Sequence, residues 1–433
     1  MKVKVETANI ENNLFFIIGL TCTWNALIVG GVAIYNYFLL LWLFFHIIKH
    51  HIGLHIIEKK SLFVNFFLLS IFFSLIASLL SLPQSWIASS IKSGIKYAFV
   101  FLTVFWLLDK RQLDFAERYF FRGFYYGALI QMVWGYLQFI LYFAFKIRFN
   151  TLAFEKILGI QYVGGTRIVW DSYVGAGNLI VLRMKGLGWE AANFALAMVI
   201  GLILSLNYKK SPIIKFLFIG ALLLSTSRSG WISLASVILA IIIKRLIGIE
   251  KRQKKNKKFF YEYCIIFALL IVSALTFGSQ ISSIILGMIH NLKMSLDTSD
   301  SMSSSSLHIA YYTNLFKVLS KSNIFNILFG NGYFSAGYIA SKNIKEFATS
   351  INHVGWNPES DFITLILGNG LFGCVGYYIF CFVGIIKHKL DTYSLMIIAI
   401  VTMGITYLTI RGTWSLLIIA FSLATLKNKR TLA

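Results

Sequence analysis

The sequence predicts an all-α integral membrane protein with about twelve transmembrane helices. Of its 433 residues, 58% are hydrophobic, 16% are aromatic and only 13% are charged. A soluble domain has about 45–50% apolar and about 25% charged residues, so the apolar excess is larger than one soluble core can bury. It also excludes disorder, which requires low hydrophobicity. Apolar runs recur along the chain, strand signals and fixed-period repeats are lacking, and lipid is therefore the expected solvent.

Each predicted helix follows from an apolar run, because a bilayer core of ~30 Å requires ~20 apolar residues. The segment between Glu11 and Lys49 carries no formal charge and is long enough for two helices, broken near Asn25 or Gly30-Gly31. The later runs are Leu62–Leu82, Tyr97–Leu108, Tyr119–Phe145, Ala191–Leu206, Pro212–Leu224, Trp231–Ile243, Tyr263–Ile281, Phe362–Ile386, Tyr393–Ile410 and Thr413–Leu426.

The distribution of charge predicts the orientation of the chain. The net charge is +23, which in a soluble protein would suggest nucleic acid. In a membrane protein Lys and Arg collect in cytoplasmic loops, so we expect membrane lipids and no nucleic acid as partners. The densest basic segment, 244–258, is therefore placed in the cytoplasm. Alternation then places both termini in the cytoplasm and the long loops 146–190 and 281–361 on the outer face.

We expect one polytopic domain over residues 1–433, without a cleavable signal peptide. The second outer loop should contain an amphipathic helix, Leu307–Leu319, and a turn at Gly330-Asn331-Gly332. No cofactor or metal is expected, because carboxylates are not clustered. Asp297 and Asp300 lie in a Ser-rich segment that reads as solvated loop. The cysteines sit in apolar runs and are interpreted as packing residues; they are Cys22, Cys264, Cys374 and Cys381.

The first candidate site is the segment from Arg183 to Asn193, which enters a predicted membrane helix. Its glycines permit close approach of a ligand to the backbone, and the N–H groups at a helix N-terminus suit a phosphate. Arg183 and Lys185 would add positive charge. Glu190 is either a partner of the helix dipole or an acid/base group.

The second candidate site is the hairpin Ser225-Thr-Ser-Arg228-Ser-Gly-Trp-Ile-Ser233, between two apolar runs. Arg228 has almost no aqueous loop around it, and the fork of a guanidinium matches phosphate or carboxylate. A structural salt bridge is the alternative.

Two further candidates lie at predicted outer helix ends. The segment from Ile351 to Phe362 contains His353, which could act as a general base near neutral pH, although a lone interfacial histidine is more often structural. Arg411 precedes the last helix. Charged residues at apolar helix ends on the translocated side run against the positive-inside trend and are functional candidates.

Taken together, these motifs resemble the bacterial O-antigen polymerase and O-antigen ligase superfamily. The resemblance rests on R-x-x-G…E-x-x-N from Arg183 to Asn193, S-x-S-R-S-G-W from Ser225 to Trp231, and N-H…G-x-x-x-E-S from Asn352 to Ser360 before G-L-x-G. It covers roughly residues 180–375. It implies a multi-spanning, lipid-sugar-dependent glycosyltransferase of the inner membrane, whose active site faces the periplasm.

The resemblance also implies roles by position. The donor and acceptor would be undecaprenyl-pyrophosphate-linked glycans, with a chain-length regulator and a flippase as possible partners. Arg228 would hold the pyrophosphate, and His353 or Glu190 would assist the acceptor hydroxyl. The remaining substrate-binding residues would be Arg183, Lys185, Asn193, His308, Glu359 and Arg411. The family often has arginine where this chain has His308, which leaves open whether Arg183 or Arg411 supplies the permanent charge.

Polymerase is the preferred activity, because the Glu190 segment and Asn-Pro-Glu-Ser at 357–360 are more polymerase-like. An O-antigen ligase, which transfers glycan to the lipid A core, is the alternative within the family. A transporter of lipid-linked oligosaccharides is the alternative of another class. It predicts mid-membrane charges and pseudo-symmetric halves, which the sequence does not show clearly. A membrane scaffold would leave the outer arginines without a purpose.

Overall fold

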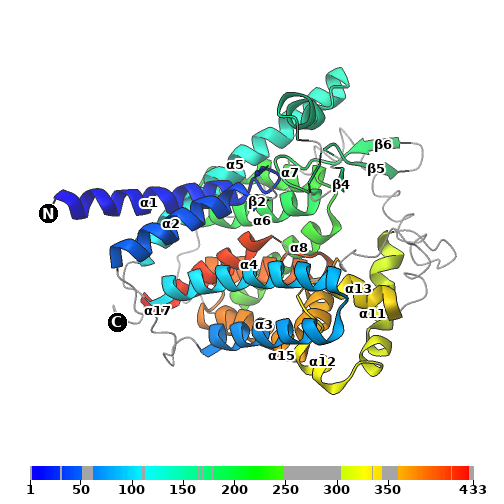
Figure 1. Cartoon of the computed structure of the whole chain (residues 1–433). Helices are drawn as coiled ribbons and strands as arrows, with labels where there is room; N and C mark the ends of the chain where they lie inside the picture. The colour runs from blue at the N-terminus through cyan, green and yellow to red at the C-terminus, as the bar shows by residue number, and fades with distance from the viewer. Residues whose placement is uncertain are drawn as a thin grey trace. The chain divides into compact units, whose positions relative to one another are not determined.

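The computed structural model is predominantly helical, as the sequence predicts (Figure 1). It describes residues 2–29, 32–50, 62–109, 113–160, 162–163, 166–167, 170–176, 179–246, 304–333, 335–343, 359–410 and 412–428. The predicted helix Tyr263–Ile281 lies outside these ranges, as do Cys264, Asp297 and Asp300. The chain divides into two compact units, residues 1–42 with 118–297 and residues 43–117 with 298–433. Each unit is described by itself.

The first unit contains the helical segments α1, α5, α6, α7 and α8, the start of α2 and the π-helix η2. Their bounds are α1 Lys2–Cys22, α2 Ile34–His50, α5 Leu113–Phe145, η2 Thr151–Ile157, α6 Ala191–Asn207, α7 Pro212–Leu224 and α8 Arg228–Leu246. Helices α6, α7 and α8 pack against one another and are joined by two short turns. Pro212 opens α7 at its first position, where the missing N–H costs no intrahelical bond.

Glycines bring α1 and α5 into close contact. A Cβ at Gly19 would lie 2.0 Å from the carbonyl oxygen of Phe120, and a Cβ at Gly123 would lie 2.0 Å from that of Phe16. Gly127 is equally tight, because a Cβ there would lie 2.3 Å from the oxygen of Leu20. Helices associate in this way in membranes, where small residues spaced by four allow the backbones to approach.

Strands are almost absent from the described residues, in keeping with the predicted all-α class. The described part of the first unit contains three short antiparallel hairpins, whose strands are too short for alternating hydrophobicity to show in the sequence. They pair β1 Ile28–Val29 with β2 Val32–Ala33, β3 Tyr162–Val163 with β4 Thr166–Arg167, and β5 Tyr173–Ala176 with β6 Leu179–Leu182. The predicted outer loop 146–190 therefore contains η2 and two hairpins.

The second unit is built around α15, which packs against α3, α12 and α16. Its helices are α3 Leu62–Ser81, α4 Gln84–Asp109, α11 Ser304–Ser320, α12 Ile324–Phe329, α13 Ala336–Asn343, α15 Asp361–Lys387, α16 Thr392–Thr406 and α17 Thr413–Asn428. The predicted helix Leu307–Leu319 is confirmed as α11. The predicted turn after Phe329 is also confirmed, with positive φ at Gly330 and Gly332.

Helix α15 is broken at Gly370, where φ is +68°. A Cβ at this position would lie 2.3 Å from the carbonyl oxygen of Leu328, so only glycine fits. The freed carbonyl groups find other donors: Gly368 O accepts from Ser74 Oγ at 2.7 Å and from Gly332 N at 3.0 Å. Neighbouring elements therefore supply hydrogen-bond partners for a backbone group at the break. A non-helical backbone within an apolar helix requires such partners.

Two described helices are long and apolar enough to cross a membrane: Arg118–Phe145 within α5 and Asp361–Ile386 within α15. The total of about twelve spans is not confirmed, because seven other apolar helices have only 10–17 residues. Both long helices carry an exposed apolar stripe. The stripe is Ile130, Val133, Leu137 and Ile140 on α5, and Val375, Ile379, Phe382 and Ile386 on α15.

Candidate functional site

The Arg183–Asn193 segment leads from β6 into α6, as predicted, and its backbone is fixed at both ends. Arg183 N donates to Ser172 O at 2.9 Å, and Met184 N donates to Leu224 O at 3.0 Å. Gly186 has φ +54°, and a Cβ there would lie 2.8 Å from the carbonyl oxygen of Gln131. The turn therefore needs glycine both for its left-handed conformation and for its close approach to α5.

The predicted hairpin at Ser225–Ser233 is also confirmed, because α7 ends at Leu224 and α8 begins at Arg228. Serine side chains close the turn between them. Ser227 Oγ accepts from Gly230 N at 3.3 Å, which caps the first turn of α8, and Ser227 N donates to Ser225 Oγ at 3.3 Å. Ser225, Thr226 and Ser227 are buried, whereas Arg228 is exposed.

The structure brings these two candidate segments together through Arg183. Its Nε donates to Thr226 Oγ1 at 3.1 Å and to Ser225 O at 3.4 Å. The Arg183 guanidinium group therefore lies against the α7–α8 turn, and Arg228 is the residue that directly follows this turn. Two of the predicted anion-binding arginines thus belong to one local structure, although they are 45 positions apart in the sequence.

The first turn of α8 lies against the second turn of α6. A Cβ on Gly230 would lie 2.5 Å from Cβ of Ala195, so glycine permits the contact. Each helix contributes partial positive charge at its N-terminus, from N–H groups that lack intrahelical partners. Two helix N-termini and two arginines make this end of the first unit suited to an anion.

Lys185, a predicted substrate-binding residue, is almost fully buried, with 2% of its surface exposed. Its Nζ donates to Trp189 O at 3.1 Å and lies 5.7 Å from the centre of the Trp170 ring. Burial lowers the pKa of Lys185 to about 8, while the charges of Asp171 and Glu190 act in the opposite direction. The structure therefore places the Lys185 side chain in the protein interior, where its ammonium group contacts other residues of the chain.

Glu190 and Asn193 begin α6. Glu190 is the N-cap residue, but its side chain makes no capping hydrogen bond. Its negative charge partly offsets the effect of burial on the pKa of Lys185. Asn193 is half-buried on the first turn. Both residues therefore share the helix end at which Arg183 and the α7–α8 turn meet.

The remaining predicted site residues belong to the second unit. His353 and Arg411 lie outside the described residues, and nothing is described of the His308 side chain on α11. Glu359 directly precedes α15. The next residue, Ser360, is hydrogen-bonded to Tyr312 of α11, with 2.7 Å between the two hydroxyl oxygens. Burial and, secondarily, the charge of Glu359 raise the pKa of Tyr311.

Sequence reasoning missed a polar network at the start of α15. Asp361 is 1% exposed and accepts hydrogen bonds from Thr409 Oγ1 and, at 3.0 Å, from Ile410 N. Tyr97 Oη donates to Ile410 O. Asp361 thereby fixes the backbone that leads to the predicted site residue Arg411. Its position between a serine N-cap and an apolar run was the available signal.

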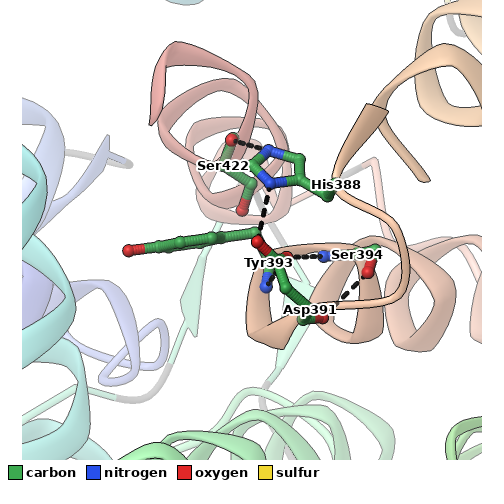
Figure 2. A network of polar contacts seen from close by, with 5 residues as sticks. All are labelled: His388, Asp391, Tyr393, Ser394 and Ser422. Carbon is green, nitrogen blue, oxygen red and sulfur yellow. Dashed lines mark hydrogen bonds and ion pairs between the residues drawn. The ribbon is translucent and has the colours of Figure 1, made fainter. Parts of the chain in front are cut away.

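A second network lies at the other end of α15 (Figure 2). His388 Nδ1 lies 3.0 Å from Asp391 Oδ2, and His388 Nε2 lies 2.6 Å from Ser422 O. Asp391 also caps α16 by accepting from Tyr393 N at 2.9 Å and Ser394 N at 3.2 Å. Both ring nitrogens are engaged, so His388 links α15, α16 and α17 as a structural residue.

Within the described ranges, no three His, Cys, Asp or Glu side chains form a group that could hold a metal ion. The cysteines that lie in them, Cys22, Cys374 and Cys381, are free, and their burial is consistent with packing residues. Comparison with protein-family models, with curated proteins and with solved structures gives no match. The functional assignment therefore depends on the residues and their geometry.

Proposed function

We propose that the chain is a membrane-embedded glycosyltransferase that polymerises a surface polysaccharide from undecaprenyl-pyrophosphate-linked repeat units. The sequence motifs that resemble the O-antigen polymerase and ligase superfamily are one support. The observation that carries the proposal is the hydrogen bonding of Arg183 to the α7–α8 turn, beside the N-termini of α6 and α8. Guanidinium groups and helix N-termini are the groups with which proteins bind phosphate.

A membrane location is supported by the exposed faces of α5 and α15. Ile140 is 55% and Phe382 is 60% exposed, and each belongs to a continuous apolar stripe. Water would make such a stripe unfavourable at roughly 25 cal/mol per Å² of apolar surface, whereas lipid would not. We propose the inner membrane, with both termini in the cytoplasm and the α6–α8 end facing the periplasm.

In the proposed reaction a hydroxyl group of the acceptor glycan attacks the anomeric carbon of the donor. The bond between that carbon and the pyrophosphate oxygen breaks, and undecaprenyl pyrophosphate leaves with the electron pair. Arg183 and Arg228 stabilise the negative charge that develops on the leaving group. His353 or Glu190 accepts the hydroxyl proton, which typically contributes ~10²–10⁴-fold. Attack opposite the leaving group inverts the anomeric centre, which NMR of the product linkage tests; retention would exclude this mechanism.

The test uses the purified full chain in lipid nanodiscs with lipid-linked repeat units. Wild type should release undecaprenyl pyrophosphate and lengthen the glycan. Arg228→Ala should slow turnover about 10²-fold or more, the usual effect of removing a group that stabilises developing charge. The matched control is Lys209→Ala, which removes an exposed cation from the α6–α7 turn and should leave the rate unchanged.

Two other outcomes would assign a different function, and a third would exclude the proposed role of Arg228. Glycan transfer only when lipid A core is supplied would identify a ligase. Movement of the lipid-linked unit across the bilayer without a new glycosidic bond would identify a transporter. Wild-type donor affinity and rate in Arg228→Ala would remove Arg228 from pyrophosphate binding.

A further inference from the structure

Asp171, which lies two residues before β5, is a buried carboxylate outside the predicted site. Only 4% of its surface is exposed. Asp171 Oδ1 accepts from Gln138 Nε2 at 2.9 Å, and Oδ2 accepts from Thr151 N at 2.9 Å and from Thr151 Oγ1 at 2.7 Å. A buried charge is costly unless it is hydrogen-bonded, and these three donors offset that cost.

The bond to Asp171 fixes the orientation of the Gln138 amide. Because Nε2 faces the carboxylate, Oε1 faces the other way and accepts from Lys185 N and Gly186 N, each at 3.3 Å. A flipped amide would place its NH2 group against two backbone N–H donors and its oxygen against a carboxylate. Asp171 therefore selects the Gln138 orientation that holds the backbone after Arg183.

The Arg183–Gly186 backbone also makes hydrogen bonds with Asn150 and Ser172. Asn150 Nδ2 donates to Gly186 O at 2.9 Å, so both polar groups of Gly186 are bonded to side chains. Ser172, the neighbour of Asp171, accepts the bond from Arg183 N through its carbonyl oxygen at 2.9 Å. The backbone before and after Met184 is thus tied to one small region around Asp171.

We propose that Asp171 is a positioning residue for Arg183, which acts through Gln138 to hold the Arg183–Gly186 backbone so that the guanidinium stays at the α7–α8 turn. We call the hydrogen bonds that run from Asp171 through Gln138 to Lys185 N and Gly186 N the tether. The predicted effect on activity rests on the proposed function, whereas the tether can be tested whatever the chain does.

Electrostatics supports the same role. The Asp171 carboxylate acts against the effect of burial on the pKa of Lys185, so it stabilises the ammonium that is buried in this segment. Gln131 is on the same side of α5 as Gln138, one heptad earlier, and a Cβ on Gly188 would lie 3.2 Å from its Nε2. The described residues give the Gln131 side chain no hydrogen-bond partner, so Gln138 is the glutamine that ties the segment to α5.

The tether is tested by hydrogen–deuterium exchange of the full-length protein in nanodiscs. Gln138→Met removes the link at nearly constant length, and Asp171→Ala removes its anchor. Both should speed exchange of the Lys185 and Gly186 amides about tenfold, the effect of losing one such hydrogen bond. Thr151→Val is the matched control. It removes the other side-chain bond of Asp171 and should change this exchange less than about twofold.

Unchanged protection of these two amides in Gln138→Met would overturn the proposal. This variant decides the question even if Asp171→Ala fails to fold. Peptides of α16 should exchange at the wild-type rate in every variant, which separates a local effect from unfolding.

Turnover distinguishes positioning from a general structural role. If Asp171 acts through Arg183, the Asp171→Ala/Arg183→Ala double variant should be no slower than Arg183→Ala, within about threefold. Losses that multiply would show that Asp171 acts independently and would overturn the proposal. Full activity of Arg183→Ala would instead refute the role of Arg183 in the proposed function, while the exchange result would still report on the tether.

Discussion

Lys185 gives the most quantitative prediction, because its ammonium group is buried and the ordinary pKa of a lysine side chain is known. Burial lowers its pKa from 10.5 to about 8. A pKa shift of one unit corresponds to about 1.4 kcal/mol. The lowered pKa therefore means that the charged form of Lys185 is destabilised in the folded protein by roughly 3 kcal/mol. The side chain is 2% exposed, and screening by solvent therefore reduces this value little.

The sign of the pH dependence follows from proton binding. Between pH 8 and pH 10.5 the unfolded chain keeps the Lys185 proton and the folded chain releases it. The free energy of unfolding therefore increases with pH in this window. Below pH 8 both states are protonated and Lys185 contributes no slope.

The perturbation is Lys185→Met, which retains most of the length and removes the titration. Unfolding of both proteins in detergent is followed by tryptophan fluorescence from pH 6.5 to pH 10.5. The stability of wild type relative to Lys185→Met should be flat up to pH 8 and then rise by roughly 3 kcal/mol. Lys209→Met, at an exposed position, should show no such rise. A difference that stays flat above pH 8 would refute the reasoning.

Three further predictions concern packing and hydrogen bonding, each measured as a change in the free energy of unfolding. Gly230→Ala should cost about 1–3 kcal/mol by separating α6 from α8, and Ala195→Gly should restore part of the loss in the double variant; additive losses would contradict this contact. Gly186→Ala should cost about 2–4 kcal/mol from its positive φ and the clash with α5; a neutral effect would mean the turn relaxes. His388→Ala should cost about 2–4 kcal/mol, because it removes two hydrogen bonds of a buried ring; a loss below about 0.5 kcal/mol would show that α15–α17 are held otherwise.

Several elements could be predicted from sequence because their signals are local. Pro212 and the polar run after Leu224 mark the two ends of α7, and Gly330 marks the end of α12. Apolar length and helix-breaking residues suffice for such boundaries. Strands of two to four residues carry no comparable pattern, and the short hairpins were therefore missed.

The assembly of the site depends on long-range contacts. The Arg183–Thr226 bond joins residues 43 positions apart, and no spacing rule predicts it. Lys185 was predicted to add positive charge for an anion, but tertiary packing buries it beside the Trp170 ring and the backbone carbonyl group of Trp189. Gln138 is polar within an apolar run, but so is Gln131, and only the structure shows that Gln138 is the residue that holds this segment.

The most direct test of the proposed function is a gel of the surface glycan from cells that lack the gene, complemented with wild type or Arg228→Ala. The deletion strain should show core carrying a single repeat unit. Wild type should convert this band to a ladder, and Arg228→Ala should not. A core without any added unit would indicate ligation or failed export, and an unchanged ladder in the deletion strain would contradict the proposed polymerase activity.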